Sequence, residues 1–144
     1  MMERWVILNP YVNVDWGIQD FSPVAEVRTI PIPSEEELIK QIREVHLLVA
    51  DVDLKITRKV LEAASHLKAV VCTATGVDYV DLPEATRRGI VVTNLPDYSV
   101  EAVAEHALAL VFCLCRNIIP AMKAVLEGRW PGRRRGAFGP MGRC

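Results

Sequence analysis

The sequence lacks the features that would place the protein in a membrane or in a secretory pathway. No apolar run is long enough to cross a bilayer, because the longest stretch, from Ala102 to Cys115, is interrupted by Glu105 and His106. The N-terminus, MMERWVILNP, has an apolar run too short for the core of a signal peptide. From these absences we expect a cytoplasmic protein with no membrane partner.

The sequence also lacks a cysteine pattern typical of metal binding or disulfides. Of the four cysteines, Cys113 and Cys115 lie two residues apart in a helical stretch, so their side chains point in different directions. Cys72 lies in an apolar run, where a thiol behaves as a small hydrophobic group. We therefore expect reduced thiols and no bound metal.

Basic charge is scarce outside the last residues of the chain. The first 128 residues hold 12 basic and 18 acidic residues, whereas residues 129–144 hold five arginines and no acid. An acidic body is a poor surface for nucleic acid, so no nucleic-acid partner is expected. The Gly, Arg and Pro composition of residues 129–144 is typical of an irregular basic tail. The alternative for this tail is a basic arm that binds phosphate groups.

What the chain does contain is an alternation of strand and helix patterns. At 144 residues, with 51% hydrophobic and 24% charged residues, it is long and apolar enough for one globular core. Ser34 and Glu37 form a capping-box pair, and Asp81 and Glu84 cap a short helix that Gly89 ends. The expected strands cover residues 4–9, 24–32, 46–51, 68–75 and 90–96, and the expected helices begin at 34, 57, 81 and 99.

This alternation predicts an α/β fold. Strands made of continuous Val, Ile and Leu imply a parallel sheet with helices on its faces, here a flavodoxin-like doubly wound sheet of five strands. Residues 1–98 would form this domain. A long helix over residues 99–128 would serve dimerisation or cross to another domain, and 129–144 would be the tail. In such sheets ligands bind beyond the carboxyl ends of the strands.

Three pieces of the sequence carry a resemblance to a known family: LKAVVCTATGVDYVDL, ATRRGIVVTNLPDYSVEAVAEHALAL and CRNI. With their spacing, they resemble the D-isomer-specific 2-hydroxyacid dehydrogenases, a family of NAD- or NADP-dependent oxidoreductases that includes phosphoglycerate dehydrogenase and glyoxylate and hydroxypyruvate reductases. The resemblance implies that this segment is the substrate-binding ("catalytic") domain. It is weaker over residues 4–66 and stops after Trp130.

The resemblance also implies what is missing. In the family a nucleotide-binding domain follows directly and opens with Gly-x-Gly-x-x-Gly, a motif that this sequence does not contain. The family's catalytic arginine, glutamate and histidine lie in or beyond that domain, and His106 does not correspond to the histidine. We therefore predict no catalytic residues, no cofactor bound by this chain and no activity alone. Loss of the coding frame before the nucleotide domain would explain the truncation.

Substrate binding is the role that remains. Family members hold the substrate carboxylate with backbone N–H groups from two loops, which the matching motifs map to Val52 and Asp53 and to Thr75 and Gly76. Gly76 either lets the backbone approach a ligand closely or only supplies a tight turn with positive φ. Asp53 departs from the expected chemistry, because a carboxylate beside an anion site repels the substrate. Weak binding of a small 2-hydroxy or 2-oxo acid is expected.

Two other classes of function are compatible with an α/β sheet of this kind, a phosphoreceiver module and a non-catalytic interaction domain. A phosphoreceiver module shares the fold and places an aspartate after its third strand, as with Asp51 or Asp53. It also needs an acidic pair after the first strand, where this chain has Asn9 and Pro10. A non-catalytic interaction domain is the stronger alternative. The 99–128 helix is apolar on nearly every face, which predicts a homodimer held by this helix.

Overall fold

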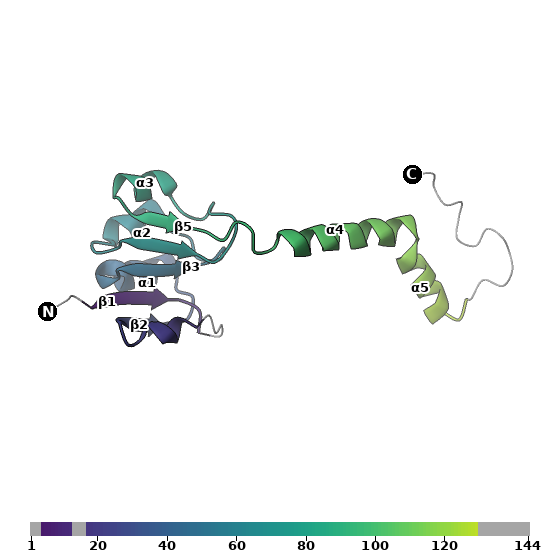
Figure 1. Cartoon of the computed structure of the whole chain (residues 1–144), viewed down its shortest axis with the longest axis horizontal. Coiled ribbons are helices and arrows are strands. Elements are labelled where there is room, and N and C mark those ends of the chain that lie inside the picture. Colours follow the sequence, from purple (N-terminus) through teal and green to yellow (C-terminus); the bar gives the residue numbers. More distant parts are fainter. Residues whose placement is uncertain (1–3, 13–16, 130–144) are drawn as a thin grey trace. The chain divides into compact units, whose positions relative to one another are not determined.

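The computed structural model describes residues 4–12 and 17–129 of the chain (Figure 1). The chain divides after Asp97 into two compact units, which are described separately. The first unit holds a five-stranded parallel sheet, and the second holds two helices. Of the predicted basic tail, residues 129–144, only Arg129 is among the described residues; residues 130–144 lie outside them.

The sheet of the first unit has the strand order β2-β1-β3-β4-β5, with every neighbouring pair parallel. This is the order of flavodoxin-like sheets, so the predicted fold class is confirmed. β2 forms one edge, as expected from the prolines that follow it. The strands are β1 (Trp5–Asn9), β2 (Ala25–Thr29), β3 (Leu47–Ala50), β4 (Ala69–Cys72) and β5 (Val91–Thr93).

The two faces of the sheet are covered unequally. One face packs against α1 (Glu35–Gln41), α2 (Arg58–Ala63) and α3 (Leu82–Arg87) and forms the larger core, which includes Leu8, Leu48 and Val70. On the other face, Ile7 and Val49 belong to a small cluster packed against the short 3-10 helix η1 (Ile18–Phe21). A second 3-10 turn, η2 (Ile42–Glu44), follows α1. The larger core therefore anchors all three central strands, β1, β3 and β4, from one side.

The helix starts predicted from the sequence are confirmed in the first unit. Ser34 and Glu37 form a complete capping box at α1, and the Asp81 side chain accepts a hydrogen bond from the Glu84 N–H at 3.0 Å. Gly89 follows α3 with a φ of 68°, the left-handed conformation that glycine adopts without steric cost. Local capping chemistry thus fixes where these helices begin and end.

The C-terminal helix is present, but the prediction of one continuous helix from Ser99 to about Gly128 is wrong. The second unit has α4 (Val100–Cys115) and α5 (Ile118–Leu126), separated by Arg116 and Asn117. Asn117 has a φ of 52°, which ends a right-handed helix. Pro120 gives the physical reason, because in a continuous helix its ring would clash with the carbonyl of residue 116. Ser99, the residue before α4, makes no side-chain capping hydrogen bond.

No single described helix is long and apolar enough to cross a membrane. α4 and α5 satisfy such a length and composition test only when joined, and they are bent by 62° at the break. The expectation that the protein has no membrane partner stays a prediction.

Candidate functional site

The candidate site lies at the carboxyl edge of the sheet, where β3 and β4 end side by side. Ala50 and Cys72 are register partners at the ends of these strands. The N–H of Thr73 donates to the carbonyl of Ala50 at 2.9 Å, which keeps the two chains paired into the loops. The predicted residues Val52 and Asp53 follow β3, while Thr75 and Gly76 follow β4. The fold therefore brings the two predicted loops to the same edge.

The loop after β3 is held by a phenol from the loop after β1. The N–H of Asp51 donates to the hydroxyl of Tyr11 at 2.6 Å. The N–H of Val52 donates to the Asp51 carboxylate at 2.7 Å, and the N–H of Leu54 to the Asp51 carbonyl at 3.0 Å. Within the described part of the chain, the N–H of Asp53 has no such partner. Of the two donors predicted here, the N–H of Val52 is bonded to the Asp51 carboxylate, and the N–H of Asp53 has no partner among the described residues.

The loop after β4 is held by the loop after β5. The hydroxyl of Thr75 donates to the carbonyl of Leu95 at 3.2 Å, and the side-chain amide of Asn94 donates to the carbonyl of Thr75 at 2.8 Å. The N–H of Leu95 donates to the carbonyl of Ala74 at 3.1 Å. Among residues 4–12 and 17–129, the N–H groups of Thr75 and Gly76 have no partner, and both residues are exposed. Two backbone donors thus remain available to a ligand.

Gly76 does not adopt the tight-turn conformation that was one interpretation of its presence. The described glycines with positive φ are Gly17, Gly89 and Gly128, and Gly76 is not among them. A Cβ built on Gly76 would meet only the carboxylate of Asp78, at 3.5 Å, which is ordinary van der Waals contact. Backbone conformation and packing therefore do not require glycine here. The other interpretation, close approach of a ligand to the backbone, remains.

The phenols at this edge stay protonated near neutral pH. Burial, together with the negative charges of Asp53 and Asp51, raises the pKa of Tyr11 to about 12. Burial, a hydrogen bond to Cys72 and the Asp51 charge raise the pKa of Tyr79, whose hydroxyl donates to the carbonyl of Ala50 at 3.5 Å. Burial is also the main cause of the raised pKa of the Cys72 thiol. The edge offers neutral donors within a field set by two aspartates.

Asn9 is a buried polar residue that sequence reasoning treated only as the end of a strand. Its side chain is 1% exposed, and its Nδ2 donates to the carbonyl of Tyr11 at 3.4 Å. Its Oδ1 has no hydrogen-bond partner in the described part of the molecule. Asn9 thereby supports the segment that presents the Tyr11 hydroxyl to Asp51.

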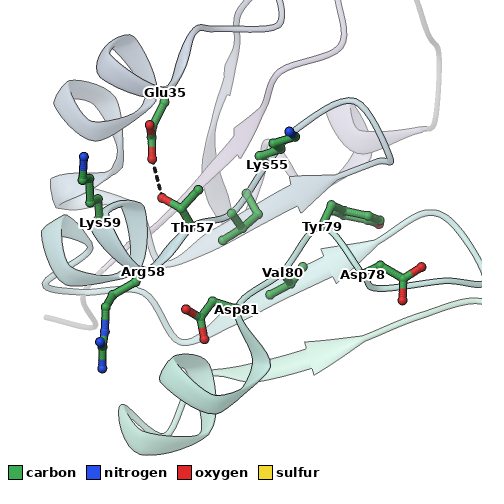
Figure 2. A pocket seen from close by; sticks show the side chains of 10 residues that line it. Glu35, Lys55, Thr57, Arg58, Lys59, Asp78, Tyr79, Val80 and Asp81 are labelled. Carbon is green, nitrogen blue, oxygen red and sulfur yellow. Dashed lines mark hydrogen bonds between the residues drawn. The ribbon is translucent and has the colours of Figure 1, made fainter.

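An open pocket of about 730 Å³ lies next to the loop after β3 (Figure 2). It contains none of the four predicted site residues. The positive and negative charges of its lining are equal in number. The basic residues are Lys55, Arg58 and Lys59, and the acidic residues are Glu35, Asp78 and Asp81. Because it has no excess of positive charge, we do not assign the anion site to this pocket.

A buried carboxylate in α3, that of Glu84, forms ion pairs with three arginines. Glu84 has a side chain that is 1% exposed, and it binds Arg87 and Arg88 at 2.5 and 2.6 Å, with Arg58 at 3.5 Å. Hydrogen bonds from Arg87 and Arg88 lower the pKa of Glu84 to about 2. These arginines stabilise the fold of α3 through the Glu84 carboxylate, and Arg58 also lies 3.7 Å from the Glu62 carboxylate. Among the described residues, no cluster of three or more His, Cys, Asp or Glu could hold a metal ion.

Comparison with known proteins agrees with the resemblance. Residues 13–136 match the family described as D-isomer specific 2-hydroxyacid dehydrogenase, catalytic domain. The chain is similar to D-3-phosphoglycerate dehydrogenase of Synechocystis sp., with 40% identity over 114 residues, which are 79% of this chain and 21% of that protein. It is also similar to glyoxylate reductase of Thermofilum pendens, with 40% identity over 98 residues, 68% of this chain and 29% of that protein.

A solved structure extends the comparison to the fold. An acyclic imino acid reductase, in complex with NADPH and D-Arg, superposes with a TM-score of 0.77 at 28% identity, covering 89% of this chain and 43% of the other. A parallel sheet of this order, with two loops at its carboxyl edge and this match over most of its length, defines the class. The chain belongs to the D-isomer-specific 2-hydroxyacid dehydrogenase family and spans less than a third of the length of the two relatives named above.

Proposed function

We propose that this chain is the substrate-binding part of an NAD(P)-dependent D-2-hydroxyacid dehydrogenase and that it is inactive alone. Its role is to hold the carboxylate of a small 2-hydroxy or 2-oxo acid at the loops after β3 and β4. The observation that carries the proposal is the set of N–H groups of Asp53, Thr75 and Gly76, which lack partners within the described residues at this edge. Consecutive backbone N–H groups at a strand–loop junction form an anion-binding nest.

The residues of this chain do not fit a dinucleotide. A pyrophosphate is held by a glycine-rich loop and the helix N-terminus that follows it, and no Gly-x-Gly-x-x-Gly occurs in the sequence. Arg58, Arg87 and Arg88 are paired with the carboxylate of Glu84. Hydride transfer therefore depends on groups outside this chain, and we assign no catalytic step to its residues.

A titration with the reduced cofactor, NADH, tests the proposal that the chain is inactive alone. NADH fluorescence is titrated with the purified 144-residue chain at micromolar concentrations, with free tryptophan as the control for absorption losses. We expect no saturable change, and no NADH formation with D-glycerate and NAD. Saturable quenching, or turnover above the blank, would contradict the proposal.

A second candidate function is a dimeric interaction module formed by α4 and α5. None of the side chains of α4 and α5 is buried, and Leu114 is 78% exposed. Leaving large apolar side chains in water costs about 1.5–3 kcal/mol each, so such a surface normally marks an interface. A second copy of the chain is the partner we propose, through a contact with two-fold symmetry. The exposed apolar residues include Val103, Leu108, Val111, Phe112, Ile119 and Val125.

The oligomeric state tests this second candidate. Light scattering at micromolar concentration is expected to give twice the 16.1 kDa mass of the chain. Charge substitutions at both Leu108 and Phe112 are expected to yield monomer or insoluble protein, whereas Glu36→Lys, at an exposed position of α1 outside these two helices, leaves the dimer intact. A wild-type mass of one chain would refute the dimer without affecting the carboxylate site.

A further inference from the structure

The carboxylate of Asp51 occupies one of the backbone donors that the family resemblance assigns to the substrate, the N–H of Val52. It accepts the N–H of Val52 at 2.7 Å, while the N–H groups of Asp53, Thr75 and Gly76 have no partner in residues 4–12 and 17–129. A carboxylate bound to a backbone N–H satisfies that donor as an external anion would. The first loop therefore already carries an anion of its own.

The backbone on either side of Asp51 is fixed, so this carboxylate does not move away freely. Its own N–H is held by the hydroxyl of Tyr11 at 2.6 Å, and its carbonyl accepts the N–H of Leu54 at 3.0 Å. Tyr11 is itself buried. Release of the Val52 N–H thus requires a change in the Asp51 side chain alone, and the loop would remain in place.

The charges around the loop act in the same direction. Asp51 and Asp53 both raise the pKa of the Tyr11 phenol, after the larger effect of burial, so their field reaches the sheet edge. The only cation between residues 51 and 57 is Lys55, which lines the neighbouring pocket together with Glu35 and Asp78. A second negative group on a ligand would meet these two carboxylates, and Arg58, which lines the same pocket as Lys55, already pairs with Glu62 and Glu84.

We propose that Asp51 is a specificity-determining residue that restricts this site to acids with a single negative charge and disfavours phosphorylated acids. The inference rests on the proposed carboxylate site and narrows its substrate class. Sequence similarity does not decide this point, since the relatives named above include both a phosphoglycerate dehydrogenase and a glyoxylate reductase, each 40% identical. A phosphate adds about 1.5 to 2 negative charges near pH 7, which the loop after β3 would repel.

A matched pair of ligands and a matched pair of variants test the proposal. The amide signals of the full chain are followed by NMR during titration with D-glycerate and with 3-phospho-D-glycerate, which differ only in the phosphate. Asp51→Asn removes the charge and keeps a side-chain oxygen that accepts the Val52 N–H, whereas Asp51→Ala removes both. Asp53→Asn removes a nearby charge without freeing an N–H and is the control.

The wild type is expected to bind D-glycerate more tightly than 3-phospho-D-glycerate. Asp51→Asn and Asp53→Asn should each strengthen binding of the phosphorylated acid by a similar factor. Asp51→Ala should strengthen it by about tenfold more, as expected for one additional charge-assisted hydrogen bond, with a new shift of the Val52 amide.

Two results would overturn the proposal, and they are distinguishable from failure of the site itself. Tighter binding of 3-phospho-D-glycerate than of D-glycerate by the wild type would show that the charge does not select. Equal affinities of Asp51→Ala and Asp51→Asn would show that the Val52 N–H has no part in binding. If neither the wild type nor any variant binds either acid, the proposed carboxylate site is absent and this inference falls with it.

Discussion

The side-chain amide of Asn94 donates a hydrogen bond to the backbone carbonyl of Thr75 at 2.8 Å and so joins the loop after β5 to the loop that carries the candidate site. The Thr75 hydroxyl returns a bond to the carbonyl of Leu95 at 3.2 Å. The Asn94 bond orients the peptide between Thr75 and Gly76, and with it the Gly76 N–H proposed to bind the carboxylate. Preorganised donors bind an anion without the cost of ordering the loop.

Removing the Asn94 amide should loosen this loop. Asn94→Ala is expected to weaken D-glycerate binding several-fold and to speed hydrogen exchange at Leu95, whose N–H donates to the Ala74 carbonyl between the same two loops, because one hydrogen bond contributes about 0.5–1.5 kcal/mol. Asp97→Ala, in the same loop, is the control and should change neither quantity. Unchanged exchange at Leu95 in Asn94→Ala would show that the bond does not hold the loop.

The fold was predictable because its strands and helix starts depend on residues that are close together in the sequence. Continuous apolar runs indicated parallel strands, and the pairs Ser34–Glu37 and Asp81–Glu84 placed two helix starts that the structure confirms. The break at Asn117 was missed because the apolar composition continues through it. Pro120 was the available signal, since a proline inside a helical pattern interrupts the hydrogen bonds of the preceding turn.

The site was predictable only in outline. The carboxyl edge and both loops follow from strand order, which fixes where the strands end. Which N–H groups are free depends on side-chain rotamers, and no sequence pattern indicated that the Asp51 carboxylate accepts the N–H of Val52. The role of Asn94 was likewise hidden, because a bond between residues 19 positions apart needs the loops to be neighbours.

Tyr11 should contribute to stability through the loop after β3. Tyr11→Phe removes the oxygen that accepts the Asp51 N–H at 2.6 Å, which leaves a partly buried donor without its partner. We expect a loss of about 1–3 kcal/mol in the free energy of unfolding, measured by urea denaturation. Tyr98→Phe, where the ring is exposed, serves as the control. Equal stabilities of the two variants would contradict this role.

Glu84 should make the stability of the first unit depend on acid pH. Its folded pKa of about 2 lies below its ordinary value of 4.5, so the carboxylate stabilises the fold fully above pH 4.5. This contribution is lost as the pH falls from 4.5 towards 2. Glu84→Gln is expected to flatten the dependence of the unfolding free energy on pH in this window, whereas Glu62→Gln, at an exposed site, should not. Parallel curves for wild type and Glu84→Gln would contradict the assignment.

The break between α4 and α5 should tolerate glycine at position 117 and resist alanine. Asn117 has a φ of 52°, where most side chains cost about 1–2 kcal/mol. Asn117→Gly should keep the helix content measured by circular dichroism and the thermal midpoint, whereas Asn117→Ala should lower that midpoint or extend the helix through the break. Identical behaviour of the two variants would argue against a left-handed residue at this position.

Gly76 is the residue that best tests whether these loops bind a carboxylate, because its missing side chain would let the ligand approach the backbone. Gly76→Ala is expected to fold as the wild type does, because the added Cβ meets only the Asp78 carboxylate at 3.5 Å and the residue does not need a positive φ. The decisive measurement is an NMR amide titration of both proteins with D-glycerate. We predict saturable, millimolar shifts of the amides of Asp53, Thr75 and Gly76 in the wild type and their loss in the folded variant. Unmoved amides in the wild type, or equal binding by Gly76→Ala, would contradict this prediction.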